Sequence, residues 1–274
     1  MLGDPEFQPL TRSGIARGVR ELGVRAGDVL MVHARLSALG WVVGGIDTVL
    51  LALRDALGPD GTLVAFCGWD DSPYHLKFWP EAWRRAYDEM PAFDPAVSSA
   101  RRDFGRFPER VRTWPGALRS SHPEVSFAAL GPRAPELITD ADDPWGPDGT
   151  LGRLLELDGR VLLLGAPLKT LTVCHHAEAI AEVEGKRYHE YRMPTLSGWR
   201  DYRTIDTFYG SLPYGEHGIT HEVAVLADQA VRAGAGTQGS VGPAESWLFE
   251  ARATVAAGVE WIERTFTPRS GTSA

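Results

Sequence analysis

The sequence of 274 residues contains only two cysteines, Cys67 and Cys174. Two thiols cannot build the disulfide framework of a small secreted domain, so we expect the protein in the reducing cytoplasm. No apolar run approaches the roughly 20 residues that a transmembrane helix needs. The opening segment, MLGDPEFQPL, has neither the basic nor the apolar part of a secretory signal, and no such signal is expected.

The chain also lacks an excess of basic side chains, since 28 Lys and Arg face 36 Asp and Glu and the formal net charge is −8. Neutralising phosphates along a nucleic acid needs the opposite balance. An acidic surface suits a cationic small molecule, because a cleft of one sign concentrates ligands of the other. Many soluble proteins are mildly acidic without such a role. We expect small-molecule substrates, no nucleic-acid or membrane partner, and a monomer or homodimer.

Hydrophobic periodicity alternates between helical and strand patterns, which predicts an α/β fold. Between residues 68 and 117, proline and aromatic residues interrupt this periodicity and indicate an inserted subregion of loops and short helices. The sequence therefore predicts one domain over residues 9–267, with a central mixed sheet flanked by helices and a long inserted loop and helical subregion. Residues 1–8 and 268–274 are expected to be flexible termini. Helices are expected at 11–22, 46–57, 81–88, 107–114, 135–138, 151–157, 223–233 and 251–266, and strands at 28–33, 62–67, 161–165, 188–193, 199–205 and 246–249, with a further strand within 119–131.

The segment RVLLLGAPLKTLTVCHHAEAIAEVE, residues 160–184, places reactive side chains just after a predicted buried strand. A helix is expected to begin near Thr170 or Thr172, and His175 and Glu178 then share one helical face. A carboxylate beside an imidazole fixes its tautomer, as a general base requires. An exposed His–Glu pair of no consequence would have the same spacing.

Two other chemistries use the same segment. His175, His176 and Glu178 are metal-ligand types, but adjacent histidines point to different sides of a helix, and no HExxH or CxxC spacing occurs. A Cys174–His175 nucleophile pair meets the same difficulty, and a buried thiol is usually inert. We predict no metal site.

Loops elsewhere could bind ligands. The segment from His33 to Gly45 follows a strand and precedes a helix, a position where backbone N–H groups often bind phosphate, although it is neither a Walker A nor a GxGxxG loop. The polar turn from Arg119 to His122 could add phosphate or hydroxyl contacts. Several carboxylates could line a site for an amine-bearing ligand, or could be ordinary surface residues: Asp70, Asp71, Asp206, Glu216 and Glu222.

Taken together, these segments resemble the aminoglycoside 3-N-acetyltransferase family. The resemblance rests on LMVHARLSALGWVVGG (30–45), GTLVAFCGWDDSPY (61–74), FDP (93–95), PGALRSSHPEVSFAALGPRA (115–134) and LLLGAPLKTLTVCHHAEAIAE (162–182), and it spans residues 14–266. Region 198–218 matches poorly. The R/Q-x-x-G-x-G/A loop of the larger N-acetyltransferase superfamily is absent, so a different fold from that superfamily is expected.

The resemblance implies transfer of acetyl from acetyl-coenzyme A to the 3-amino group of an aminoglycoside in a ternary complex, giving antibiotic resistance. It implies His175 as the catalytic base and Glu178 as a supporting carboxylate. Many members carry serine where this chain has Ala34, so one hydroxyl contact to the coenzyme is expected to be missing. The expected coenzyme contacts are His33, Ala34, Arg35, Leu36, Ser37, Leu39, Gly40, Val42, Val43, Gly44, Ser120 and His122. The expected antibiotic contacts are Asp70, Asp71, Tyr74, Asp206 and Glu216. An acyltransferase acting on another small amine, or a non-catalytic protein that binds a nucleotide-like ligand, remain as alternatives.

Overall fold

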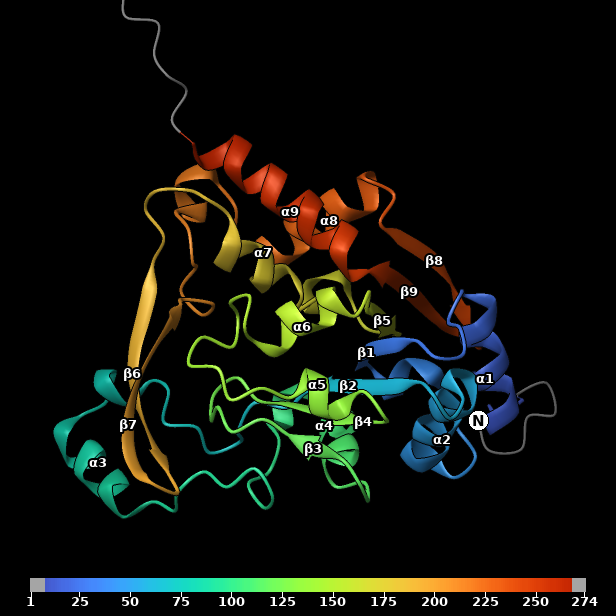
Figure 1. Ribbon diagram of the computed structural model, residues 1–274, viewed down its shortest axis with the longest axis horizontal. Coiled ribbons are helices and arrows are strands. Elements are labelled where there is room, and N and C mark those ends of the chain that lie inside the picture. Colours follow the sequence, from blue (N-terminus) through green and yellow to red (C-terminus); the bar gives the residue numbers. More distant parts are fainter. Residues whose placement is uncertain (1–7, 268–274) are drawn as a thin grey trace, which may run out of the picture.

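Seven strands form one mixed sheet in the order β3-β4-β2-β1-β5-β9-β8 (Figure 1). The computed structural model describes residues 8–267, so the flexible termini predicted for 1–8 and 268–274 lie outside the described part except for Gln8. At the centre of the sheet, β1 pairs in parallel with β2 and β5, and the remaining pairs are antiparallel. The strands are β1 (Val29–Ala34), β2 (Thr62–Phe66), β3 (Leu118–Arg119), β4 (Phe127–Leu130), β5 (Arg160–Leu164), β8 (Gly236–Val241) and β9 (Ala244–Glu250).

Each central strand is apolar on both faces, and its side chains alternate between two cores. In β1, Met31 enters one core, whereas Leu30 and Val32 enter the other. The first core also contains residues of α5 (Ala134–Leu137), α6 (Thr150–Glu156), α7 (Cys174–Ile180), α8 (Glu222–Arg232) and α9 (Ala251–Phe266). The second core contains residues of α1 (Arg12–Glu21), α2 (Gly45–Leu57) and α4 (Arg106–Arg112). The predicted central mixed sheet flanked by helices is confirmed.

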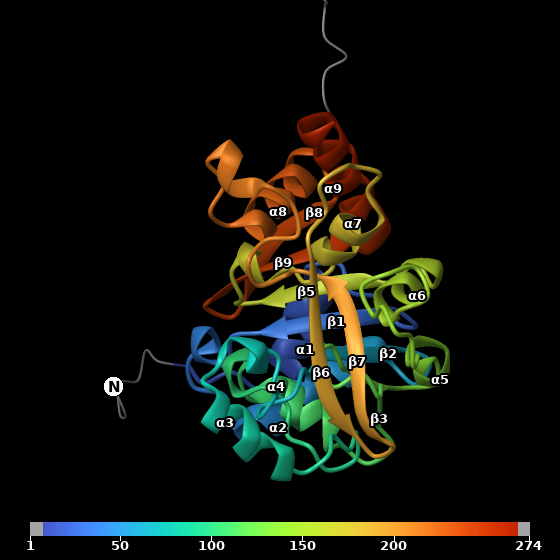
Figure 2. The same ribbon diagram turned by 90° about the vertical axis from the view of Figure 1, so that its left-hand side faces the viewer.

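A separate hairpin of β6 (Tyr188–Thr195) and β7 (Gly198–Ile205) stands beside the sheet, with α3 (Glu81–Ala86) next to it (Figures 1 and 2). The predicted inserted subregion packs on this hairpin, where the Phe93 N–H donates to the Pro194 carbonyl at 2.8 Å. Within residues 8–267 no helix has both the length and the apolar character that crossing a bilayer would require.

The structure differs from the sequence prediction at one strand and one helix. Strand β8 was not predicted, because its sequence GTQGSV is rich in glycine and polar residues and is defined only by its pairing with β9. Gly236 is needed there, since a Cβ would lie 2.4 Å from the Phe249 ring. Helix α7 begins at Cys174 rather than near 170 or 172, because Leu168–Thr170 forms a separate 3₁₀ turn.

Candidate active site

A cavity of about 630 Å³ opens at the carboxyl ends of β1, β2 and β5. The backbone brings the two loops after β1 and β5 together, because Ala34 pairs with Leu164 and the Arg35 N–H donates to the Leu164 carbonyl at 3.0 Å. Gly165 then turns the chain at a φ of +65°, in the left-handed region that favours glycine. Loops at the carboxyl edge of parallel strands are the usual place for a ligand in an α/β sheet.

His175 and Glu178 form a hydrogen-bonded pair at this cavity. Nδ1 of His175 lies 2.6 Å from Oε2 of Glu178, across one turn of α7. Because Nδ1 donates to the carboxylate, the second ring nitrogen is left as a proton acceptor, and His175 lines the cavity. Glu178 therefore contacts the imidazole and lies outside the lining of the cavity.

Glu178 is fully buried and anchored on both oxygens. Its Oε1 accepts hydrogen bonds from Ser211 Oγ at 2.7 Å and from Tyr214 OH at 2.6 Å. Burial acts to raise the pKa of Glu178, but His175 and the two hydroxyls outweigh it and hold the pKa below its ordinary value. The carboxylate stays ionised and fixed in place, as the orienting partner of a general base should be.

His176 and Cys174 are buried residues that hold helix α7 in place rather than reactive groups of the cavity. His176 is buried, and its Nδ1 lies 2.7 Å from the Trp145 carbonyl oxygen. The Trp145 ring packs against the His175 ring with centroids 4.9 Å apart, so both histidines help to fix α7 against the loop that carries Trp145. Burial raises the pKa of the Cys174 thiol, which makes it a poor nucleophile. In the described part of the chain, no group of three His, Cys, Asp or Glu residues is arranged to hold a metal ion.

The expected coenzyme loop reaches the cavity only in part. Its first five residues, 33–37, line the cavity. Leu39 is instead a fully enclosed core residue, and Gly40, Val42, Val43 and Gly44 lie outside the lining. The lining also includes three basic side chains for which residues 8–267 offer no ion-pair partner: Arg35, Arg106 and Lys169. These cations make this wall of the cavity suitable for an anionic ligand.

Ser120 and His122 are both buried and hold the turn that precedes β4. Ser120 Oγ accepts from the Phe127 N–H at 3.0 Å, and His122 Nδ1 accepts from the Val125 N–H at 3.0 Å. Burial lowers the pKa of His122 to about 3, so its imidazole is neutral at physiological pH. In this arrangement both side chains bond within the protein rather than line the cavity.

Of the five expected antibiotic contacts, Tyr74 lines the cavity. Asp70 lies 2.6 Å from Nε of Arg102 and also accepts the Arg102 N–H. Asp71 is exposed, and Glu216 pairs with Arg187 at 3.4 Å. Asp206 Oδ1 caps the following turn by accepting the Phe208 and Tyr209 N–H groups. These four carboxylates lie outside the lining of the cavity.

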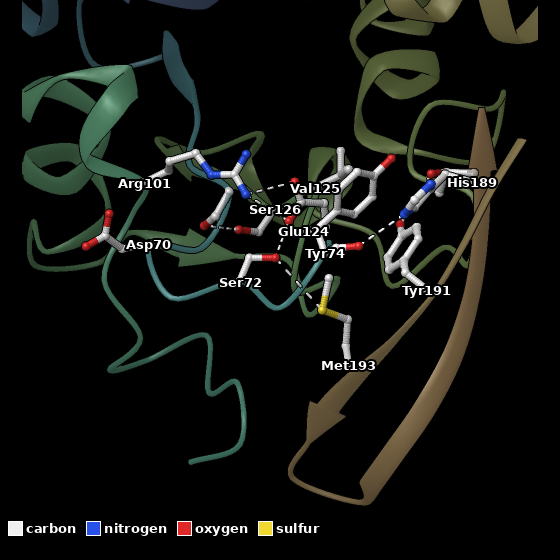
Figure 3. A network of polar contacts seen from close by, with 12 residues as sticks. Asp70, Ser72, Tyr74, Arg101, Glu124, Val125, Ser126, His189, Tyr191 and Met193 are labelled. Carbon is white, nitrogen blue, oxygen red and sulfur yellow. Dashed lines mark hydrogen bonds and ion pairs between the residues drawn. The ribbon is translucent and has the colours of Figure 1, made fainter. Parts of the chain in front are cut away.

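A partly buried carboxylate that the sequence did not single out does line the cavity. Glu124 accepts hydrogen bonds from Arg101 Nη2 at 2.8 and 2.9 Å and from the Ser72 hydroxyl (Figure 3). Burial raises the pKa of Glu124 despite the opposing effect of Arg101. Figure 3 shows Tyr74 beside this network, with its carbonyl oxygen 3.0 Å from Nε2 of His189.

Other residues of the site were also missed, for different reasons. Glu124 and Lys169 lie inside quoted motifs, where their charge was a usable signal. Trp145 lies in a loop rich in proline and glycine without a motif. Ser211 and Tyr214 are 33 and 36 residues from Glu178 in sequence, so only the fold could bring them to it.

Comparison with known proteins shows the family of this chain. The sequence pattern of the family described as aminoglycoside 3-N-acetyltransferase matches residues 31–263. The aminoglycoside N(3)-acetyltransferase VIII of Streptomyces fradiae is 52% identical over 266 residues, which cover 93% of this chain and 92% of the relative. The aminoglycoside N(3)-acetyltransferase III of Pseudomonas aeruginosa is 37% identical, with 94% and 95% covered.

Solved structures give the same result. The aminoglycoside acetyltransferase AAC(3)-Xa superposes with a TM-score of 0.90 at 47% identity, covering 95% of both chains. AAC-IIIb in its binary complex with CoASH superposes with a TM-score of 0.87 at 38% identity, covering 96% of this chain and 100% of that one. The resemblance inferred from the sequence is confirmed, and the chain belongs to the aminoglycoside 3-N-acetyltransferase family.

Proposed function

We infer that the protein transfers the acetyl group of acetyl-coenzyme A to the 3-amino group of aminoglycoside antibiotics, and that this reaction gives resistance. The observation that carries the assignment is the His175–Glu178 pair at 2.6 Å, with Glu178 buried beneath the imidazole and His175 at the wall of the cavity. Membership of the family supplies the reaction, and the pair supplies a base that the reaction needs.

The chemistry requires a proton to be removed. An aminoglycoside amine is largely protonated at neutral pH, and an ammonium group has no lone pair with which to attack a thioester. The free ring nitrogen of His175 accepts this proton, and the ionised Glu178 stabilises the imidazolium that forms. The amine nitrogen then bonds to the acetyl carbon and loses a second proton to solvent, the carbon–sulfur bond breaks, and the sulfur leaves as the thiol with the first proton returned through His175.

The three unpaired cations Arg35, Arg106 and Lys169 suit the phosphates of the coenzyme. Arg35 follows β1, and Lys169 lies in the segment that leads from β5 to His175. Glu124, which pairs with Arg101, and Tyr74 lie on the wall nearer the hairpin, where their oxygen atoms offer hydrogen-bond acceptors to an ammonium group of the antibiotic. The two substrates would thus bind at chemically different walls of one cavity.

We place this activity in the cytoplasm, on a monomer or homodimer that binds no nucleic acid. The support comes from composition: two cysteines suit a reducing compartment, and a net charge of −8 opposes phosphate-backbone binding.

The decisive experiment measures thiol release from acetyl-coenzyme A across a panel of aminoglycosides. Thiol release with aminoglycosides and not with simple metabolite amines supports the assignment. Release with other amines alone favours the alternative acyltransferase, and coenzyme binding without release favours a binding protein. In the same assay His175→Ala should lose about 10²–10⁴-fold in kcat while still binding acetyl-coenzyme A. Near-normal turnover by that variant would show that His175 is not the catalytic base.

A further inference from the structure

Three large aromatic side chains lie exposed beside one another, and we name Phe78, Phe208 and Tyr209 the aromatic lip. They expose 58%, 60% and 55% of their surface respectively. Their rings contact one another in sequence, with centroids 4.8 Å apart for Phe208 and Tyr209 and 5.7 Å apart for Tyr209 and Phe78. Phe208 itself lines the cavity. Soluble proteins seldom expose adjoining apolar rings without a ligand or partner for them.

The turn that carries the lip is built to hold these rings outward. Asp206 Oδ1 accepts the Phe208 N–H at 3.1 Å and the Tyr209 N–H at 2.8 Å. The Asp206 N–H donates to the Arg187 carbonyl at 2.9 Å, and Gly210 closes the turn at a φ of +98°. Exposure of Phe208 and Tyr209 is therefore fixed by hydrogen bonds at the base of the turn, and Asp206 acts as a positioning residue.

The same segment continues to the catalytic pair. The Arg187 N–H donates to the Ser211 carbonyl at 2.8 Å, and Ser211 Oγ donates to Glu178 at 2.7 Å. Ser211, two residues after Tyr209, is thus already bonded to the carboxylate that orients His175. A ligand resting on the lip is held at a fixed position relative to the base.

The charges around the lip favour a cation. Asp206 caps the turn that carries Phe208 and Tyr209, and Glu124 lines the same cavity as Phe208. Burial raises the pKa of Tyr74, and these two carboxylates raise it further. Burial lowers the pKa values of His75 and His189, so both imidazoles beside the rings are neutral at physiological pH.

One cation already lies on the lip. The Lys77 ammonium is 5.2 Å from the centroid of the Phe78 ring, where it also donates to the Glu190 carbonyl. No side-chain cation of residues 8–267 lies over Phe208 or Tyr209 in the same way, so their faces are the ones available to a ligand. Aromatic faces attract ammonium groups and stack on the apolar faces of sugar rings.

We propose that Phe208 and Tyr209 form a specificity subsite for a second, amine-bearing sugar ring of the antibiotic, beyond the ring that is acetylated. This inference rests on the proposed function. It assigns antibiotic selection to the turn 206–209, which lies in the region 198–218 that matches the family poorly.

The test compares variants with two kinds of acceptor, a multi-ring aminoglycoside and a single-ring diaminocyclitol that lacks the second sugar ring. In the Phe208→Ala/Tyr209→Ala double variant we expect KM for the multi-ring antibiotic to rise roughly 5–30-fold. The KM values for the single-ring acceptor and for acetyl-coenzyme A should stay at the wild-type level. Phe208→Tyr keeps the ring and should retain the wild-type KM, whereas Phe208→Leu keeps an apolar side chain and should still be impaired.

Trp83→Ala is the matched control, because Trp83 is 61% exposed on α3 but lies outside the lining of the cavity. It should leave every KM unchanged. An unchanged KM for the multi-ring antibiotic in the double variant, an equal loss with the single-ring acceptor, or a rise in KM for acetyl-coenzyme A instead would each overturn the proposal. If wild-type protein released no thiol with any aminoglycoside, the proposed function itself would fail, which is a separate outcome.

Discussion

Replacing Glu178 with glutamine tests the catalytic pair most sharply, because the side chain keeps its shape and loses only its charge. Oε1 of Glu178 accepts two hydroxyl donors, Ser211 at 2.7 Å and Tyr214 at 2.6 Å, while Oε2 faces His175 Nδ1 at 2.6 Å. In Glu178→Gln only the amide oxygen can accept the two hydroxyls. The NH₂ group then faces Nδ1, and a donor at that position moves the ring proton to the other nitrogen.

Two effects set the expected fall in kcat. A charge-assisted hydrogen bond contributes about 1.5–3 kcal/mol, which corresponds to roughly 10–100-fold in rate. The inverted tautomer adds to this, because the nitrogen that should accept the substrate proton now carries one. We expect kcat to fall about 10²–10⁴-fold, the full contribution of a general base. Both KM values should change little, since Glu178 is fully buried and lies outside the lining of the cavity.

Initial rates of thiol release at saturating substrates measure this effect, with thermal unfolding to confirm that the variant is folded. Adding Tyr214→Phe to Glu178→Gln removes one of the two donors that fix the amide, so the amide can turn its oxygen toward Nδ1. The double variant should therefore be faster than Glu178→Gln, although Tyr214→Phe alone should be slower than wild type. A kcat for Glu178→Gln close to that of wild type, or no recovery in the double variant, would refute the reasoning.

Three further predictions concern stability and the coenzyme. Gly165→Ala should lower the free energy of unfolding by about 2–4 kcal/mol in urea titrations. The φ of residue 165 is +65°, and the new Cβ would lie 2.6 Å from Ala38 Cβ. An unchanged urea midpoint of unfolding would contradict this. Burial lowers the pKa of His122 from 6.5 to about 3, so its contribution is fully present above pH 6.5 and is lost as pH falls toward 3. By pH 5 the loss should reach about 2 kcal/mol in urea titrations, and a loss equally large in His122→Asn would exclude this origin. Arg35→Ala and Lys169→Ala should each raise KM for acetyl-coenzyme A roughly threefold to tenfold, and the increase should be smaller at high salt. A larger effect on KM for the antibiotic would show that this wall of the cavity binds the antibiotic instead of the coenzyme.

The sequence alone determined the local features of this protein. Buried strands such as β5 are continuous apolar runs, and helices such as α9 have a clear 3.6-residue period, so most elements were predicted close to their observed bounds. His175 and Glu178 were predicted as a pair because their spacing of three residues is enough to bring them together on one helix. Family motifs then distinguished His175 from His176.

Only the tertiary structure decided what surrounds that pair. Ser211 and Tyr214 reach Glu178 from a distant segment, and β8 exists because β9 pairs with its glycine-rich backbone. The sequence does not show which way a charged side chain points. In the structure Asp70 pairs with Arg102, whereas Glu124 lines the cavity. The pair on α7 follows from the geometry of one helix, whereas its anchoring and the cavity depend on contacts between segments that are far apart in the chain.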